Sequence, residues 1–129
     1  MKRIIKSLFD FLRPSALNAI AAKCITEEWE QIKYYHEILS YTCIEAEKEN
    51  LDAIKSISQF LVEKAAALTI ENMPAPYRNP KTIETLVLLK TQTNFVHQLV
   101  LKNNPDVEIK VELHKLNTTF KTIATHCNS

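Results

Sequence analysis

Three histidines and one cysteine are the side chains that could bind a metal ion within the long helical segments of this sequence. They are His36, Cys43, His97 and His114. Imidazole and thiolate groups are the usual protein ligands of zinc and copper. His36 and Cys43 lie two helical turns apart, which is too far for one ion, and no His-x-x-x-His pair occurs. A site would therefore lie between helices, either with His36 and groups of the last helix or with Cys43 and His97.

The same residues also have a purely structural interpretation. His36 would then be a core histidine that is hydrogen-bonded to Tyr35 or Asn117, and Cys43 and Cys127 would be small core residues. The three cysteines are an odd number without a Cys-x-x-Cys pair, which argues against a zinc knuckle or a thioredoxin-like motif. We expect reduced thiols and no obligatory cofactor, with zinc or copper as the alternative.

Several enzyme classes are disfavoured by what the sequence lacks. It contains no glycine, which Rossmann, P-loop and nucleophile-elbow motifs all require. No histidine follows a glutamate by three residues, so a ferritin-like di-iron site is not encoded. Isolated cysteines without a paired base do not make a nucleophilic site. We therefore expect a protein that is not an enzyme.

The helices that would position these side chains are visible as heptad stripes. The last stripe consists of Ile109, Leu113, Leu116, Phe120, Ile123 and Cys127. The first consists of Ile25, Trp29, Ile32, His36, Leu39, Cys43 and Ala46. We expect the first long helix to begin near Ser15 or Thr26 and to end near Glu49.

Two further helices lie between these stripes. The second helix is expected to start from Asn50 as N-cap and to bury Ile54, Ile57, Leu61, Ala65 and Leu68. Asn79-Pro80 and Asn104-Pro105 predict the starts of the third and last helices, with the asparagine as cap and the proline as first helical residue. The third helix should bury Ile83, Leu86, Leu89, Thr93, Val96 and Val100.

Four helices with short connections predict an all-α, antiparallel up-down-up-down four-helix bundle over residues 15–129. Matching levels at about 1.5 Å per residue places His36 near Leu116 and Asn117, His97 near Cys43, and Cys24 near Cys127. A chain of 129 residues, 46% hydrophobic and 24% charged, fits one globular domain.

Residues 1–14 form a separate N-terminal segment that is expected to contain a short amphipathic helix over residues 2–12. Its apolar face is Ile4, Ile5, Leu8, Phe9 and Leu12, and its basic face is Lys2, Arg3 and Lys6. Such a segment either packs on a bundle or a second copy, or lies on an anionic membrane surface. Asp10, Arg13 and Pro14 interrupt an export signal, so we expect a cytoplasmic protein, with export as the alternative. The net charge of +1 gives no reason to expect nucleic-acid binding.

The last helix resembles one found in small bacterial helical-bundle proteins of unassigned function. The resemblance rests on Leu113-His114-Lys115-Leu116-Asn117 through Ile123 and Cys127, on Trp29 followed by His36-Glu37, and on Ala66-Ala67-Leu68 with Met73-Pro74. In that family the last helix reads roughly Leu-His-Asp-x-Phe-His-x-Ile. The resemblance implies an exported or lipid-anchored protein that binds heavy metal. Two of the family histidines fall on Asn117 and Lys121, so a site here would combine His36 with His114 or His97.

The sequence thus predicts a helical-bundle interaction module that is not an enzyme and that binds a protein partner or itself. The alternative is a bundle with an interhelical zinc or copper site formed by His36, Cys43, His97 and His114.

Overall fold

The computed structural model describes residues 29–125. It contains the helices α3 (Glu30–Glu47), α4 (Asp52–Ala66), α5 (Pro80–Leu101) and α6 (Asp106–Ala124), with a short 3-10 turn at Ala75–Tyr77. The described residues contain no strand. The predicted amphipathic helix over residues 2–12 lies outside the described residues, as does the proposed boundary between residues 14 and 15.

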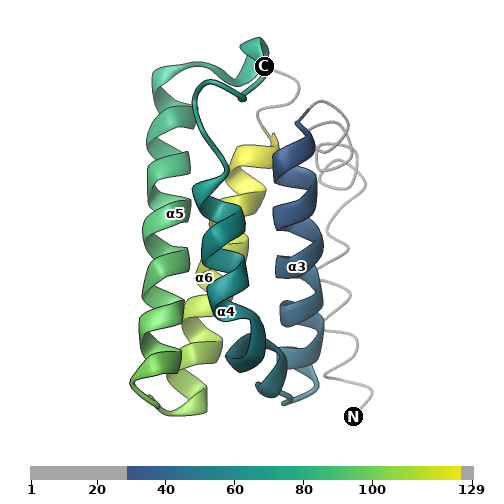
Figure 1. Cartoon of the computed structure of the whole chain (residues 1–129), viewed down its shortest axis with the longest axis vertical. Coiled ribbons are helices and arrows are strands. Elements are labelled where there is room, and N and C mark those ends of the chain that lie inside the picture. Colours follow the sequence, from purple (N-terminus) through teal and green to yellow (C-terminus); the bar gives the residue numbers. More distant parts are fainter. Residues whose placement is uncertain (1–28, 126–129) are drawn as a thin grey trace.

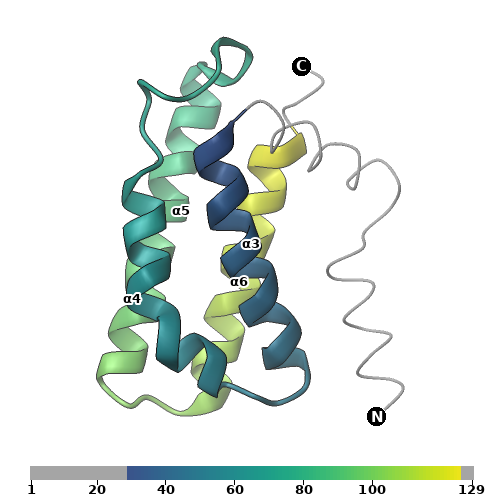
Figure 2. The ribbon, with the colours of Figure 1, turned by 45° about the vertical axis from the view of Figure 1, so that its right-hand side comes forward.

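The four helices form a closed ring in which each packs on the next and α6 returns to α3. Successive helices run in opposite directions, so the chain makes an up-down-up-down bundle (Figures 1 and 2). The predicted all-α four-helix architecture is confirmed. In residues 29–125 none of these helices combines the length and the apolar character that a membrane span requires.

The core contains all the apolar stripe positions of α6 that are described, Ile109, Leu113, Leu116, Phe120 and Ile123. Of the predicted stripe positions of α3 that are described, only His36 is not buried, and Tyr35, Thr42 and Glu47 are buried in addition. Tyr35 is fully buried, whereas His36 lies half-buried at the edge of the core. Tyr35 takes the inner position because its hydroxyl has a buried partner, the hydroxyl of Thr93 on α5, at 2.8 Å.

The stripe of α4 contains a polar residue that the hydrophobic pattern does not predict. Ser58 is 3% exposed, whereas the predicted Ile57 is only half-buried. On α5, Leu99 is buried in the place predicted for Val100, which is half-buried. Both shifts move the buried face by one residue: Leu99 and Val100 are both apolar, whereas Ser58 is buried where its hydroxyl bonds to His97.

Glutamate and asparagine occupy the left-handed positions, usually taken by glycine, after the ends of α3 and α5. Glu49 and Asn103 have positive φ angles of 64° and 54°. After each, the next amide returns to the last turn: Asn50 N donates to Glu45 O at 2.8 Å, and Asn104 N donates to Leu99 O at 3.0 Å. These are the hydrogen bonds of a Schellman cap, a motif that usually places glycine at the left-handed position.

The helix starts agree with the sequence only in part. Asn79 caps α5 as predicted, because its side chain accepts a hydrogen bond from Thr82 N at 2.9 Å. The cap of α4 is Leu51, not Asn50, and the cap of α6 is Pro105, not Asn104. In both cases the predicted asparagine instead follows the left-handed residue that closes the preceding helix. The tight Schellman turn therefore delays the next helix by one residue.

The connection from α4 to α5 is fixed to the start of α3 by one tryptophan. Trp29 is fully buried and donates its indole N–H to Oδ1 of Asn72 at 2.8 Å. Trp29 itself is extended, so α3 begins at Glu30 and not at Thr26. This end of the bundle lies opposite the short turn that joins α5 to α6 (Figure 1).

Candidate functional site

The ring of His36 stacks on Phe120 of α6, with centroids 4.6 Å apart and planes inclined by 6°. The contact lies about one turn from the predicted level of Leu116 and Asn117. Burial lowers the pKa of His36, and the charge of Glu37 only partly opposes that effect, so the ring packs as a neutral aromatic group. The predicted hydrogen bonds to Tyr35 or Asn117 are wrong. The Tyr35 hydroxyl bonds to Thr93, and the buried Nδ2 of Asn117 has no hydrogen-bond partner in the described part of the chain.

Cys43 is 2% exposed and faces the seam between α3 and α6. Burial is the main cause that raises the pKa of its thiol, and the nearby Glu47 carboxylate adds to the effect. Lys121 across the seam opposes the shift without cancelling it. A thiol held protonated in the core is neither a nucleophile nor a ready metal ligand.

His114 lies one turn from the level of Cys43, and its neighbour is a carboxylate. Its Nε2 is 3.9 Å from Oε2 of Glu47, and Nζ of Lys110 is also 3.9 Å from that oxygen. The Glu47 side chain is only 7% exposed. A buried carboxylate needs cationic or hydrogen-bonding partners, and Lys110 and His114 of α6 lie beside this one. The arrangement is that of an ion-pair network joining two helices.

His97 is joined to α4 rather than to α3. Its Nδ1 lies 2.8 Å from Oγ of Ser58, close enough for a hydrogen bond in either tautomer. The bundle places α5 diagonally across from α3, so this bond holds the ring on a different side from Cys43 (Figure 2). The sequence did not predict the pair because Ser58 lies between two apolar stripe positions and looks like a surface residue.

The four predicted ligands are therefore distributed over three places in the described structure. His36 lies on Phe120, Cys43 and His114 lie along the α3–α6 seam, and His97 lies on α4. Among residues 29–125 no three His, Cys, Asp or Glu side chains gather in a group that could hold a metal ion. Cys24, His126 and Cys127 lie outside these residues.

A different feature is an open hollow on the outer surface between α5 and α6, with a volume of about 210 Å³. We call it the α5–α6 groove, and its lining residues are Phe95, Leu99, Val107, Glu108, Val111 and Glu112. Three of its apolar residues are largely exposed: Phe95 by 48%, Val107 by 67% and Val111 by 46%. Single exposed apolar residues are common, but a group lining one hollow is typical of an interaction surface.

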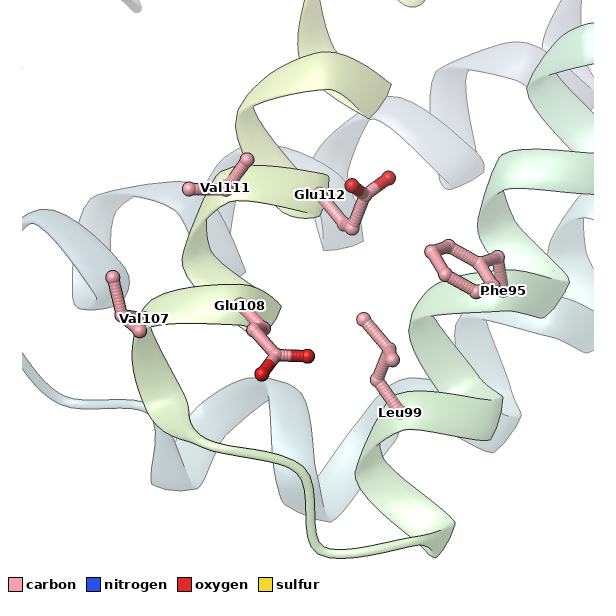
Figure 3. Close-up of a pocket in the computed structure, with 6 residues that line it drawn as sticks. All are labelled: Phe95, Leu99, Val107, Glu108, Val111 and Glu112. Carbon is pink, nitrogen blue, oxygen red and sulfur yellow. The ribbon is translucent and has the colours of Figure 1, made fainter.

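Two carboxylates lie at the groove. Figure 3 shows Glu108 and Glu112 on the side of α6 that faces Phe95 and Leu99 of α5. Glu108 accepts a hydrogen bond from the neutral amide of Asn104 at 3.0 Å, so its negative charge is not compensated there. Glu112 lies 3.0 Å from Nζ of Lys115, an exposed residue on its own helix. The groove therefore combines apolar side chains with two carboxylates, which lie between Val107 and Val111 on one side and Phe95 and Leu99 on the other (Figure 3).

The groove could not be predicted from the sequence. Its residues come from two helices, and the heptad pattern assigns most of these positions to the solvent-exposed faces. The sequence contained a weak indication. Val107 and Val111 are four residues apart, and they lie on the face of α6 opposite Ile109 and Leu113. A second hollow, of about 280 Å³, lies between the α4–α5 connection and α5. Its lining includes Ile70, Val87 and Lys90, but Nζ of Lys90 is already bonded to Leu68 O at 2.6 Å.

Comparison of the chain with protein-family models, with characterised proteins and with solved structures gives no match. The resemblance of residues 113–123 to small bacterial bundle proteins therefore stays a prediction. The case for a function rests on the geometry of the described residues alone.

Proposed function

We propose that this chain is a non-enzymatic helical-bundle module that binds an amphipathic helical segment in the α5–α6 groove. The observation that carries the proposal is the group of largely exposed apolar side chains from two helices beside the carboxylates of Glu108 and Glu112. The apolar side chains are Phe95, Val107 and Val111. Binding of an amphipathic helix by an apolar groove is a recurrent mode of recognition, in which residues spaced by three and four reach the floor.

The two carboxylates of the groove define the chemistry of the segment. Glu108 and Glu112 are one turn apart on α6, so lysine or arginine residues spaced by one turn on a bound helix would face them. Charges at the rim of an interface contribute mainly to orientation and to the rate of association, and apolar contacts provide most of the affinity. A segment with an apolar face and a basic face satisfies both requirements.

The buried polar residues support a scaffold role over catalysis. The Cys43 thiol is kept protonated by burial, His97 is bonded to Ser58, and the Glu47 carboxylate is bracketed by Lys110 and His114. Two of these groups join helices, since His97 joins α5 to α4 and Glu47 joins α3 to α6, whereas the Cys43 thiol fills space in the core. They hold the rigid framework on which the groove is built.

The experiment is a fluorescence titration of the full-length protein with three labelled helical peptides. One is leucine and lysine in amphipathic order, the second is leucine and glutamate in the same order, and the third is a scrambled leucine–lysine sequence. We expect only the first to saturate, and Phe95→Gln with Val111→Gln to weaken its binding by about tenfold or more. The matched control is Ile70→Gln with Val87→Gln, which changes two exposed apolar residues at the second hollow.

The control pair should leave the affinity unchanged. Equal binding to the native protein and to the Phe95/Val111 variant would refute the α5–α6 groove as the site. Equal binding of the two amphipathic peptides would refute the role of Glu108 and Glu112.

A further inference from the structure

We propose that the occupant of the α5–α6 groove is residues 2–12 of a second copy of this chain, exchanged reciprocally in a symmetric dimer. This inference rests on the proposed binding function of the groove and identifies its partner.

The first argument is charge complementarity. Residues 2–12 combine the apolar residues Ile4, Ile5, Leu8, Phe9 and Leu12 with the basic residues Lys2, Arg3 and Lys6. Lys2 and Lys6 are separated by four residues, the same spacing as Glu108 and Glu112 on α6. A helix over residues 2–12 would place the two lysines one above the other, so both could face the two carboxylates. The chain thus encodes a segment of the chemistry that its own groove requires.

The second argument is reach. Residues 13–28 separate the basic segment from Trp29, and sixteen residues can span at most about 55 Å when extended. Trp29 lies at the end of the bundle opposite the α5–α6 turn, and α3, with 18 residues, is about 27 Å long. The segment can therefore reach a groove on a neighbouring copy. Its own groove lies on the outer side of α5 and α6, which faces away from α3 and α4, so occupation in the same chain requires a path around α6.

The third argument is the amount of surface. Stable protein interfaces bury roughly 1,200–2,000 Å² in total. In a reciprocal exchange the same segment and the same groove are used twice about a two-fold axis, so the area buried between two copies is twice that of one segment in one groove.

A charge-swap experiment on the full-length protein tests the proposal. The first variant reverses the groove, with Glu108→Lys and Glu112→Lys. The second reverses the segment, with Lys2→Glu, Arg3→Glu and Lys6→Glu. Sedimentation velocity then measures the mass of the native protein, of each variant and of their equimolar mixture. Circular dichroism and thermal unfolding of each variant establish that the bundle is folded.

We expect the native protein to be a dimer and each variant alone to dimerise at least about tenfold more weakly, because each then pairs like charges at both grooves. The mixture should restore the dimer. In a heterodimer, the basic segment of the first variant meets the acidic groove of the second, and the acidic segment of the second meets the lysine groove of the first. The control variant, Glu63→Lys with Glu84→Lys, carries the same charge change at exposed sites outside the groove and should dimerise like the native protein.

A monomeric native protein, or a mixture of variants that stays monomeric, would overturn the proposal. So would binding of the native monomer to vesicles of phosphatidylcholine and phosphatidylserine that is lost with Lys2→Glu, Arg3→Glu and Lys6→Glu, because the segment would then serve a lipid surface. If the native protein is monomeric but the leucine–lysine peptide still binds and still depends on Phe95 and Val111, the groove function stands and only the identity of the occupant is wrong.

Discussion

Replacement of Asn117 by leucine should stabilise the protein, because it removes a buried side-chain donor that has no hydrogen-bond partner in the described structure. Asn117 is 3% exposed, and its Nδ2 has no hydrogen-bond partner there. An unsatisfied buried amide costs about 1–3 kcal/mol. Leucine has the same number of side-chain heavy atoms and the same branching, so it occupies the site without a new cavity.

The net gain is smaller than this cost, because two methyl groups are bulkier than an amide. Overpacking of a filled core costs about 1 kcal/mol at its lower limit. We therefore expect Asn117→Leu to raise the free energy of unfolding by up to about 2 kcal/mol, and the melting temperature by roughly 4 °C for each kcal/mol gained in a chain of this size. Urea unfolding followed by circular dichroism measures the free energy, and differential scanning calorimetry measures the melting temperature.

The matched control lies two residues further along the same helix. Thr119 is 7% exposed, and its hydroxyl donates to Oε1 of Gln92 at 2.6 Å and lies 3.1 Å from Lys115 O. Thr119→Val keeps the shape and removes these bonds, so it should destabilise the protein by about 1 kcal/mol. The reasoning would be refuted if both substitutions destabilised the protein equally. Asn117 would then have a partner that its burial conceals.

Three further predictions follow from particular residues. Glu49→Gly should stabilise the protein by about 0.5–1 kcal/mol in urea unfolding, since relief of the left-handed backbone outweighs the exposed ion pair with Lys110; a loss of stability would contradict this. Burial lowers the pKa of His36, so the unfolded chain takes up the proton first and stability falls as the pH drops below about 6.5. His36→Gln, measured by urea unfolding at about pH 7.5 and about pH 5.5, should show a smaller loss than the native protein, and an equal loss would exclude His36 as the cause. Cys43 should react with iodoacetamide only as fast as the bundle opens, so peptide mass spectrometry should show its labelling accelerating with sub-denaturing urea; fast labelling without urea would place the thiol at the surface.

The bundle could be predicted from the sequence because its information is periodic. The apolar stripe of α6 continues without interruption from Ile109 to Ile123, and every member is buried. Asn79-Pro80 marked the start of α5 because the cap bond is local and depends on one side chain and the next turn. Both features need only near neighbours in the chain, and such features are accessible without a structure.

The errors occurred where a second helix or a neighbouring turn decides the outcome. Tyr35 is buried in preference to His36 because Thr93, 58 residues away, lies opposite its hydroxyl. Ser58 is buried because His97 accepts or donates a bond at the same level. Asn50 and Asn104 belong to the ends of the preceding helices, since each follows a left-handed residue and donates its backbone amide to the last turn of that helix. A single-helix pattern carries none of these contacts.

The predicted metal ligands and the α5–α6 groove both show that a single-helix pattern does not reveal which side chains the bundle brings together. His36, Cys43, His97 and His114 attract attention because their side chains are chemically distinctive, yet the bundle separates them and gives each a packing or pairing role. Valine and phenylalanine are not distinctive one at a time. Phe95, Val107 and Val111 become informative only when two helices bring them to one hollow beside Glu108 and Glu112. In the described part of the chain these residues are the better candidates for a binding role, because the predicted metal ligands already have a packing or pairing role.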